Sequence, residues 1–250
     1  MKNAKARPDV NLVQAASWQN PYFPRHVIER NRETMDARRF NALFGGQWQR
    51  MAGLVYDCFD DDENQCEPFA LPTGTRFVGG IDWGFTDPFV FRVRAITVEG
   101  RHYGVHEFYK TGLVISEIVT IVCRLVEVWN VTQIFCDPSQ PAHIEELNRR
   151  FRSQGLRCAA IPANNEIRMG IDRHYELVKS RRIKYFKGAN PHFLDEVETY
   201  HYPEPKDLTA DQKSKDELPV TQADHVMDTE RYITSMTYES KHRLKAIVPD

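Results

Sequence analysis

Three short apolar segments follow one another closely in the first half of the chain. They run from Phe77 to Asp82, from Phe89 to Ile96 and from His102 to Tyr109. Glycine occurs in both connections, and proline in the first, as is typical of tight turns between antiparallel strands. We therefore expect a three-stranded meander, against which the following segments must pack because a sheet has to bury its apolar faces.

Segments of helical and strand-like spacing alternate after the meander. Because parallel strands need crossover connections, this alternation predicts further strands in the same sheet with helices packed on it. The expected fold is α/β: a ribonuclease-H-like mixed sheet, with an antiparallel meander plus parallel strands and helices on both faces. We expect strands at 131–137, 156–161 and 182–186, and helices at 115–129, from 141, at 167–178, at 191–200 and from 224.

The region before the meander has a different composition. Prolines, an arginine-rich piece and the acidic run at 60–63 interrupt it, with one or two short helices expected between 24 and 44 and a short strand at 54–56. We therefore expect three parts: an irregular N-terminal arm at 1–75, a ribonuclease-H-like domain at 76–240 and a C-terminal tail at 241–250.

The composition is that of an ordinary soluble protein, with 41% apolar and 27% charged residues. No apolar run approaches the roughly 18 residues of a membrane span, and the start lacks the apolar middle of a secretory signal. We expect no membrane association and a cytoplasmic location. The five cysteines are widely spaced without a C-x-x-C pair, which favours reduced thiols over disulfides or a zinc site. A net charge of −2 gives no global sign of nucleic-acid binding.

Two aspartates end apolar strands. Asp82 precedes Trp83-Gly84, and Asp137 precedes a loop in which Ser139 is the better candidate for capping the next helix. Open sheets place ligands at the carboxyl ends of their strands, so both carboxylates are candidates for a site. The alternative interpretations are a hairpin turn for Asp82 and a capping loop for Asp137.

A third acidic cluster opens the last expected helix. Asp224 and Asp228 are four residues apart and share a helical face, and His225 is their neighbour. A solvated face with Asp224 as N-cap, and His225 as a surface histidine, is the alternative. Oxygen ligands from separate elements suit Mg²⁺ or Mn²⁺, which activate water and stabilise a leaving oxygen when a phosphodiester is cut. The pattern predicts a metal-dependent nuclease.

The segments 81–88, 135–139 and 223–232 together resemble the nuclease domain of tailed-bacteriophage terminase large subunits, over about 53–238. The resemblance implies that Asp82, Asp137 and Asp228 are metal ligands, with Asp224 and His225 beside them, for two Mg²⁺ or Mn²⁺ ions. Thr229 stands where the family usually has alanine. The implied activity is endonucleolytic cutting of double-stranded phage DNA concatemers during genome packaging in the host cytoplasm. The implied partners are a packaging ATPase, a small terminase subunit and a portal, in a possible oligomer.

No G-x-x-x-x-G-K-[ST] phosphate loop occurs, so we expect no ATPase activity of the motor type from this chain. Three alternatives stay open. The first is another ribonuclease-H-like nuclease, such as a junction resolvase or integrase, and the second is a phosphate-binding actin-like ATPase or sugar kinase. The third is a non-catalytic module that docks DNA or the motor. Basic clusters at 149–152, 179–187 and 241–245 would track phosphates, or simply form solvated faces.

Overall fold

The computed structural model describes residues 15–35, 37–46, 53–203, 218–221 and 224–238. The chain divides into two compact units, one made by residues 1–52 and 203–217 and the other by 53–202 and 218–250. The expected tail at 241–250 and the basic cluster at 241–245 lie outside the described residues. None of the helices in the described ranges is long and apolar enough to cross a bilayer.

The smaller unit is helical in its described part and is held by aromatic side chains. It contains a short helical turn η2 (Ser17–Gln19), α1 (Arg25–Thr34) and α2 (Ala37–Leu43). Phe40 stacks on Trp18 and on Phe44, with ring centroids 6.2 and 5.3 Å apart, and Arg32 lies over the Phe40 ring. The helices expected between 24 and 44 are thus confirmed.

The larger unit is built on a seven-stranded sheet with the strand order β2-β8-β5-β4-β3-β6-β7. The expected meander is confirmed, because β3 pairs antiparallel with β4 and β4 antiparallel with β5. The other neighbouring pairs are parallel, which gives the predicted mixed sheet. The strands are β2 (Gln65–Cys66), β3 (Arg76–Asp82), β4 (Phe89–Ile96), β5 (His102–Lys110), β6 (Val131–Cys136), β7 (Ala159–Pro162) and β8 (Ile183–Phe186). A separate pair joins β1 (Gly53–Leu54) to β9 (His201–Tyr202).

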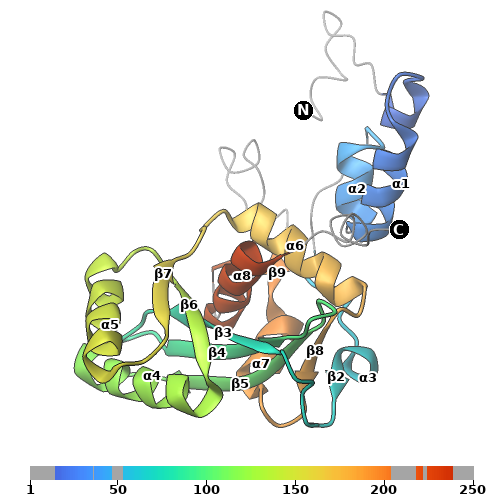
Figure 1. Cartoon of the computed structure of the whole chain (residues 1–250). Coiled ribbons are helices and arrows are strands. Elements are labelled where there is room, and N and C mark those ends of the chain that lie inside the picture. Colours follow the sequence, from blue (N-terminus) through green and yellow to red (C-terminus); the bar gives the residue numbers. More distant parts are fainter. Residues whose placement is uncertain (1–14, 36, 47–52, 204–217, 222–223, 239–250) are drawn as a thin grey trace, which may run out of the picture. The chain divides into compact units, whose positions relative to one another are not determined.

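Helices cover both faces of this sheet, as expected (Figure 1). The apolar stripe of α4 packs with α5 on the face that carries Phe91 and Val93, whereas α8 packs on the opposite face beside Val78. The helices of this unit are α3 (Asp61–Asn64), α4 (Ile115–Trp129), α5 (Pro141–Gln154), α6 (Ile167–Lys179), α7 (Pro191–Thr199) and α8 (His225–Thr237).

Residues 53–75 lie in the same unit as the sheet, through contacts that the sequence did not suggest. Asn64 at the end of α3 is fully buried, and its Nδ2 donates to the carbonyl oxygens of Val178 and Ile183. β2 follows directly and pairs parallel with β8. The acidic run at 60–63 therefore begins a short helix, with Asp60 as its N-cap, that ties the chain to the edge of the sheet.

A glycine lets α8 approach the sheet closely. A Cβ atom on Gly80 of β3 would lie 2.8 Å from Cγ1 of Ile233 and 2.9 Å from the carbonyl oxygen of Thr229. Both distances are shorter than van der Waals contact, so any side chain here would push the helix away from β3. Gly80 thus sets the distance between the strand that ends in Asp82 and the helix that begins at His225.

Candidate active site

Asp82 and Asp137 lie at the same edge of the sheet. β3 and β6 are parallel neighbours, with Ile81 opposite Cys136, and the amide of Asp137 donates to the carbonyl oxygen of Ile81 at 2.9 Å. The indole Nε1 of Trp83 donates to the carbonyl oxygen of Asp137 at 3.0 Å. Adjacent strands therefore bring the two carboxylates to one end of the sheet, as the sequence suggested.

The start of α8 meets this edge. Nδ1 of His225 lies 2.9 Å from Oδ2 of Asp82, and this hydrogen bond is the leading cause that raises the pKa of the imidazole. Asp224 occupies the N-cap position, but its side chain makes no capping hydrogen bond. His225 is therefore not an isolated surface histidine. The alternative interpretation, in which the side chain of Asp224 caps the helix, is wrong.

Negative charge accumulates around Asp82. Burial raises the pKa of Asp82 to about 6, with a further increase from Asp228 and Asp137, although the hydrogen bond from His225 lowers it. Burial also raises the pKa of Asp224, and the charge of Asp228 adds to this effect. The charges of Asp228 and Asp137 thus reach Asp82, and that of Asp228 reaches Asp224. Clustered negative charge of this kind is the condition under which a cation would stabilise the carboxylates.

Each of three carboxylates is also bound by a donor of the protein itself. Besides the contact of Asp82 with His225, Asp228 accepts from Nη2 of Arg231 at 2.8 Å. Asp137 accepts from the amide of Ser139 at 3.0 Å and from its hydroxyl group. Ser139 therefore binds Asp137 and does not cap α5, contrary to expectation. No three His, Cys, Asp or Glu side chains in the described ranges are grouped to hold one metal ion.

The chemistry of this donor set nevertheless fits a hard divalent cation. Carboxylate oxygens are the ligands that Mg²⁺ and Mn²⁺ prefer, and four aspartates from a sheet edge and one helix start supply them. The guanidinium of Arg231 provides the positive charge that balances Asp228, and the imidazole of His225 provides a hydrogen bond to Asp82. A cation at this edge would compete with both groups for the same oxygens.

The sequence pattern did not predict the contacts of two further residues of the site, Arg231 and Glu196. Arg231 of α8 is only 3% exposed, and its Nη1 donates to Oδ1 of Asn165 at 2.7 Å. Glu196 of α7 accepts from the amides of Val226 and Met227 with its Oε2 atom. An arginine three residues after an aspartate is a local signal for the first contact, but nothing local indicates the second.

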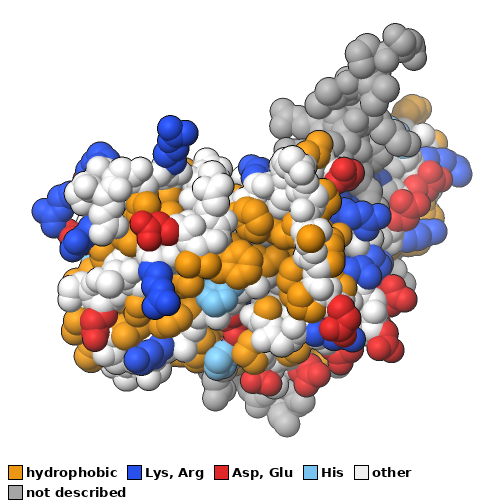
Figure 2. All heavy atoms as spheres, turned by 60° about the horizontal axis from the view of Figure 1, so that its bottom comes forward, with side chains coloured by type: hydrophobic (Ala, Val, Ile, Leu, Met, Phe, Trp, Pro, Cys, Tyr) orange, Lys and Arg blue, Asp and Glu red, His pale blue; other side chains and the backbone are white. Residues whose placement is uncertain are grey.

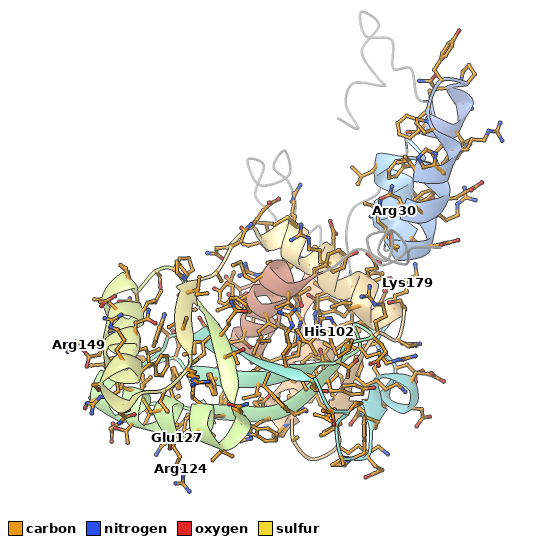
Figure 3. The ribbon with its side chains drawn as sticks, in the orientation of Figure 1. Arg30, His102, Arg124, Glu127, Arg149 and Lys179 are labelled. Carbon is orange, nitrogen blue, oxygen red and sulfur yellow. The ribbon has the colours of Figure 1, made fainter. Side chains whose placement is uncertain are left out.

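The basic clusters of the sequence are partly neutralised by acidic neighbours. On α5, Arg149 pairs with Glu146 and Arg152 with Glu145, and Arg149 points away from the helix toward solvent (Figure 3). Figure 2 shows a face whose middle is occupied by hydrophobic side chains, with Lys and Arg gathered toward its margins. This face carries no continuous basic surface.

Solved structures of phage large terminases have the same fold. The large terminase of a thermophilic bacteriophage in complex with ATP-gamma-S is 19% identical, with a TM-score of 0.74. The match covers 94% of this chain but only 58% of that protein, so the chain spans little more than half of it. The P22 large terminase nuclease domain is 19% identical, with 74% of this chain and 92% of that one covered and a TM-score of 0.57. The large terminase nuclease of thermophilic phage G20c with bound cobalt is 16% identical, with 76% and 100% covered and a TM-score of 0.54.

The sequence gives a family match as well. No curated protein matches the chain significantly. The model of the family described as "Terminase RNaseH-like domain" matches residues 79–236, which include all five candidate site residues and more than half of the 250 residues. The chain therefore belongs to the terminase RNaseH-like domain family.

Proposed function

We propose that this chain is a metal-dependent endonuclease that cuts double-stranded phage DNA concatemers during genome packaging. The observation that carries the proposal is the meeting of Asp82, Asp137 and the start of α8 at one edge of the sheet. The family assignment supports a metal site at this edge of the sheet, because a nuclease of this class needs carboxylates from separate elements to hold its metal ions.

The proposed ligands are Asp82, Asp137 and Asp228, with Asp224 beside them. The related G20c nuclease has been observed with bound cobalt and with bound magnesium, which supports divalent-ion use here. Two Mg²⁺ or Mn²⁺ ions would supply activation of the attacking water and stabilisation of the departing 3′ oxygen.

The protein's own side chains prepare the carboxylates for this task. The amide and hydroxyl group of Ser139 hold the carboxylate of Asp137 in one orientation, and His225 does the same for Asp82. Arg231 balances the charge of Asp228. These donors offset part of the repulsion among the acidic groups at the sheet edge.

The larger assembly follows as part of the same proposal. The chain spans 58% of the large terminase that was observed with ATP-gamma-S, and it contains no phosphate-loop motif of its own. We therefore propose that a packaging ATPase works with this nuclease, together with a small terminase subunit and a portal, in an oligomeric motor in the host cytoplasm.

A non-catalytic docking module is the second candidate. The ion pair between Asp228 and Arg231 favours it, because a carboxylate held by a buried guanidinium is less available to a metal ion. A resolvase-like nuclease would use the same ligands on branched DNA, and would be distinguished by its preference for a four-way junction over linear duplex.

The test is conversion of supercoiled plasmid to nicked and linear forms with Mg²⁺, Mn²⁺ or EDTA. Asp82→Asn should abolish cleavage, whereas Asp87→Asn, on the exposed loop after the same strand, should cleave as the wild type does. Cleavage that persists in EDTA or in Asp82→Asn refutes the proposed site. Folded wild-type protein that binds DNA but cuts it with neither metal supports the docking module.

A further inference from the structure

Three buried glutamates connect the sheet to the helix of the candidate site. Glu107 of β5 accepts from the amides of His192 and Phe193 in the first turn of α7, at 2.8 and 3.0 Å. Glu196 of α7 in turn contacts the first turn of α8, and Glu230 of α8 pairs with arginines of β4. The chain of contacts therefore runs from sheet to α7, from α7 to α8, and back to the sheet.

Glu196, the second of these three glutamates, takes the place of a helix-capping side chain. Oε2 of Glu196 accepts from the amides of Val226 and Met227 at 2.8 and 3.1 Å. These amides belong to the first turn of α8, where backbone donors have no partner within the helix. Asp224, at the N-cap position, leaves them to Glu196. A carboxyl group thirty residues upstream thus does what a capping side chain ordinarily does.

Capping of α8 by Glu196 affects the side chains of the candidate site. With the cap supplied by Glu196, the carboxyl group of Asp224 is not engaged in capping α8. The same two hydrogen bonds fix the turn from which His225 reaches the carboxylate of Asp82. They also fix Asp228, which lies three residues further along the first turn of α8. The position of all three side chains depends on where the first turn of α8 is held.

We infer that Glu196 is a positioning residue of the nuclease site: by capping α8 from α7 it sets the first turn of that helix and leaves Asp224 available to the site. The inference rests on the proposed function for the meaning of the site. Glu196 is 4% exposed and is not among the proposed metal ligands, so it acts through α8 and not on the substrate.

The test compares Glu196→Leu, which keeps the approximate size but removes the acceptor, with Glu196→Gln, which keeps an oxygen able to accept. Glu198→Leu is the matched control, because Glu198 is exposed on the same helix. Amide hydrogen exchange is followed in the first turn of α8 without metal or DNA. Loss of a helix cap should speed exchange there about fivefold or more in Glu196→Leu, with most of the protection restored in Glu196→Gln and none lost in the control.

Metal binding gives the second measurement, by electron paramagnetic resonance during titration with Mn²⁺. We expect the half-saturating concentration to rise about tenfold in Glu196→Leu and to stay near the wild-type value in Glu196→Gln. Unchanged exchange in the first turn of α8 and unchanged Mn²⁺ affinity in folded Glu196→Leu overturn the inference. Should Glu196→Leu not fold, Glu196→Ala takes its place with the same expected faster exchange and weaker Mn²⁺ binding, and unchanged values for both overturn the inference. Wild-type protein that neither binds Mn²⁺ nor cuts DNA refutes the proposed function instead.

Discussion

Replacing Asp82 by asparagine should make the metal-free protein more stable at pH 8. The residue is only 8% exposed, and burial, with a contribution from Asp228, raises the pKa of its carboxyl group from 3.8 to about 6. A carboxyl group with a higher pKa in the folded state binds more protons when folded. Its favourable contribution is therefore fully present below pH 3.8 and is lost as the pH rises through 6.

The size of the effect follows from the difference between the two pKa values. A difference of about two pH units, at about 1.4 kcal/mol each, gives about 3 kcal/mol as the cost of ionised Asp82 at pH 8. Asparagine keeps the size and can still accept from Nδ1 of His225, but the loss of a charged partner offsets about 1 kcal/mol. The net gain of about 2 kcal/mol corresponds to an increase in Tm of about 4–8 °C for a domain of this size.

Urea unfolding in EDTA at pH 8 and pH 5 measures this gain for Asp82→Asn against wild type. The gross gain should fall to about half at pH 5, because the wild-type carboxyl group is then largely protonated in the folded state. Asp87→Asn is the control, since Asp87 is exposed and its replacement should change stability little. If Asp82→Asn is no more stable than wild type at pH 8, or if its free energy of unfolding rises equally at both pH values, then ionisation of Asp82 does not destabilise the folded protein.

Three further predictions concern α8 and the buried side chains that contact it. Gly80→Ala should cost about 1–3 kcal/mol by overpacking against Ile233. The loss in urea unfolding should shrink when Ile233→Ala removes the contacting side-chain carbons, and equal losses in both backgrounds refute the contact. Glu230→Gln should cost about 3–5 kcal/mol, because it removes the partner of two buried arginines, whereas a cost below about 1 kcal/mol would show that the pairs add little. Burial lowers the pKa of His174 to about 3, so the folded protein excludes a proton that the unfolded chain accepts below pH 6.5. Stability should fall as the pH drops from 6.5 toward 3, and His174→Gln should flatten this slope in pH-dependent thermal melts.

The strands and helices of the larger unit could be predicted because their signals are local. The apolar run at 89–96 lies between two turns, and the helical spacing in 115–129 reflects burial of one helical face; β4 and α4 have those bounds in the structure. The start of the last helix was also recognisable, from the cluster at 224–228. Each of Asp82 and Asp137 could be placed at the carboxyl end of its strand. That the two strands are neighbours was implied only by the resemblance to terminase nucleases, and the structure has them paired.

The contacts that were not predicted join residues far apart in the sequence. The capping of α8 by Glu196 spans thirty residues, and a carboxyl group on one helix carries no sign of which helix start it will meet. The strand β2 contains two residues and pairs at an edge, which is too short for a periodic pattern. Charged residues are rarely buried, and nothing near Arg231 in the sequence indicates that contacts with Asp228 and Asn165 stabilise it inside the protein.

The two arginines of β4 also determine how this central strand can align with its neighbours. Phe91 and Val93 face α4, while the guanidinium groups of Arg92 and Arg94 meet Glu230 on the other side. A shift of one residue in strand pairing would exchange the two faces and bury both charges in the apolar layer. A misaligned form of this sheet would therefore be strongly disfavoured, and the two arginines help to select a single alignment of β4 with its neighbours.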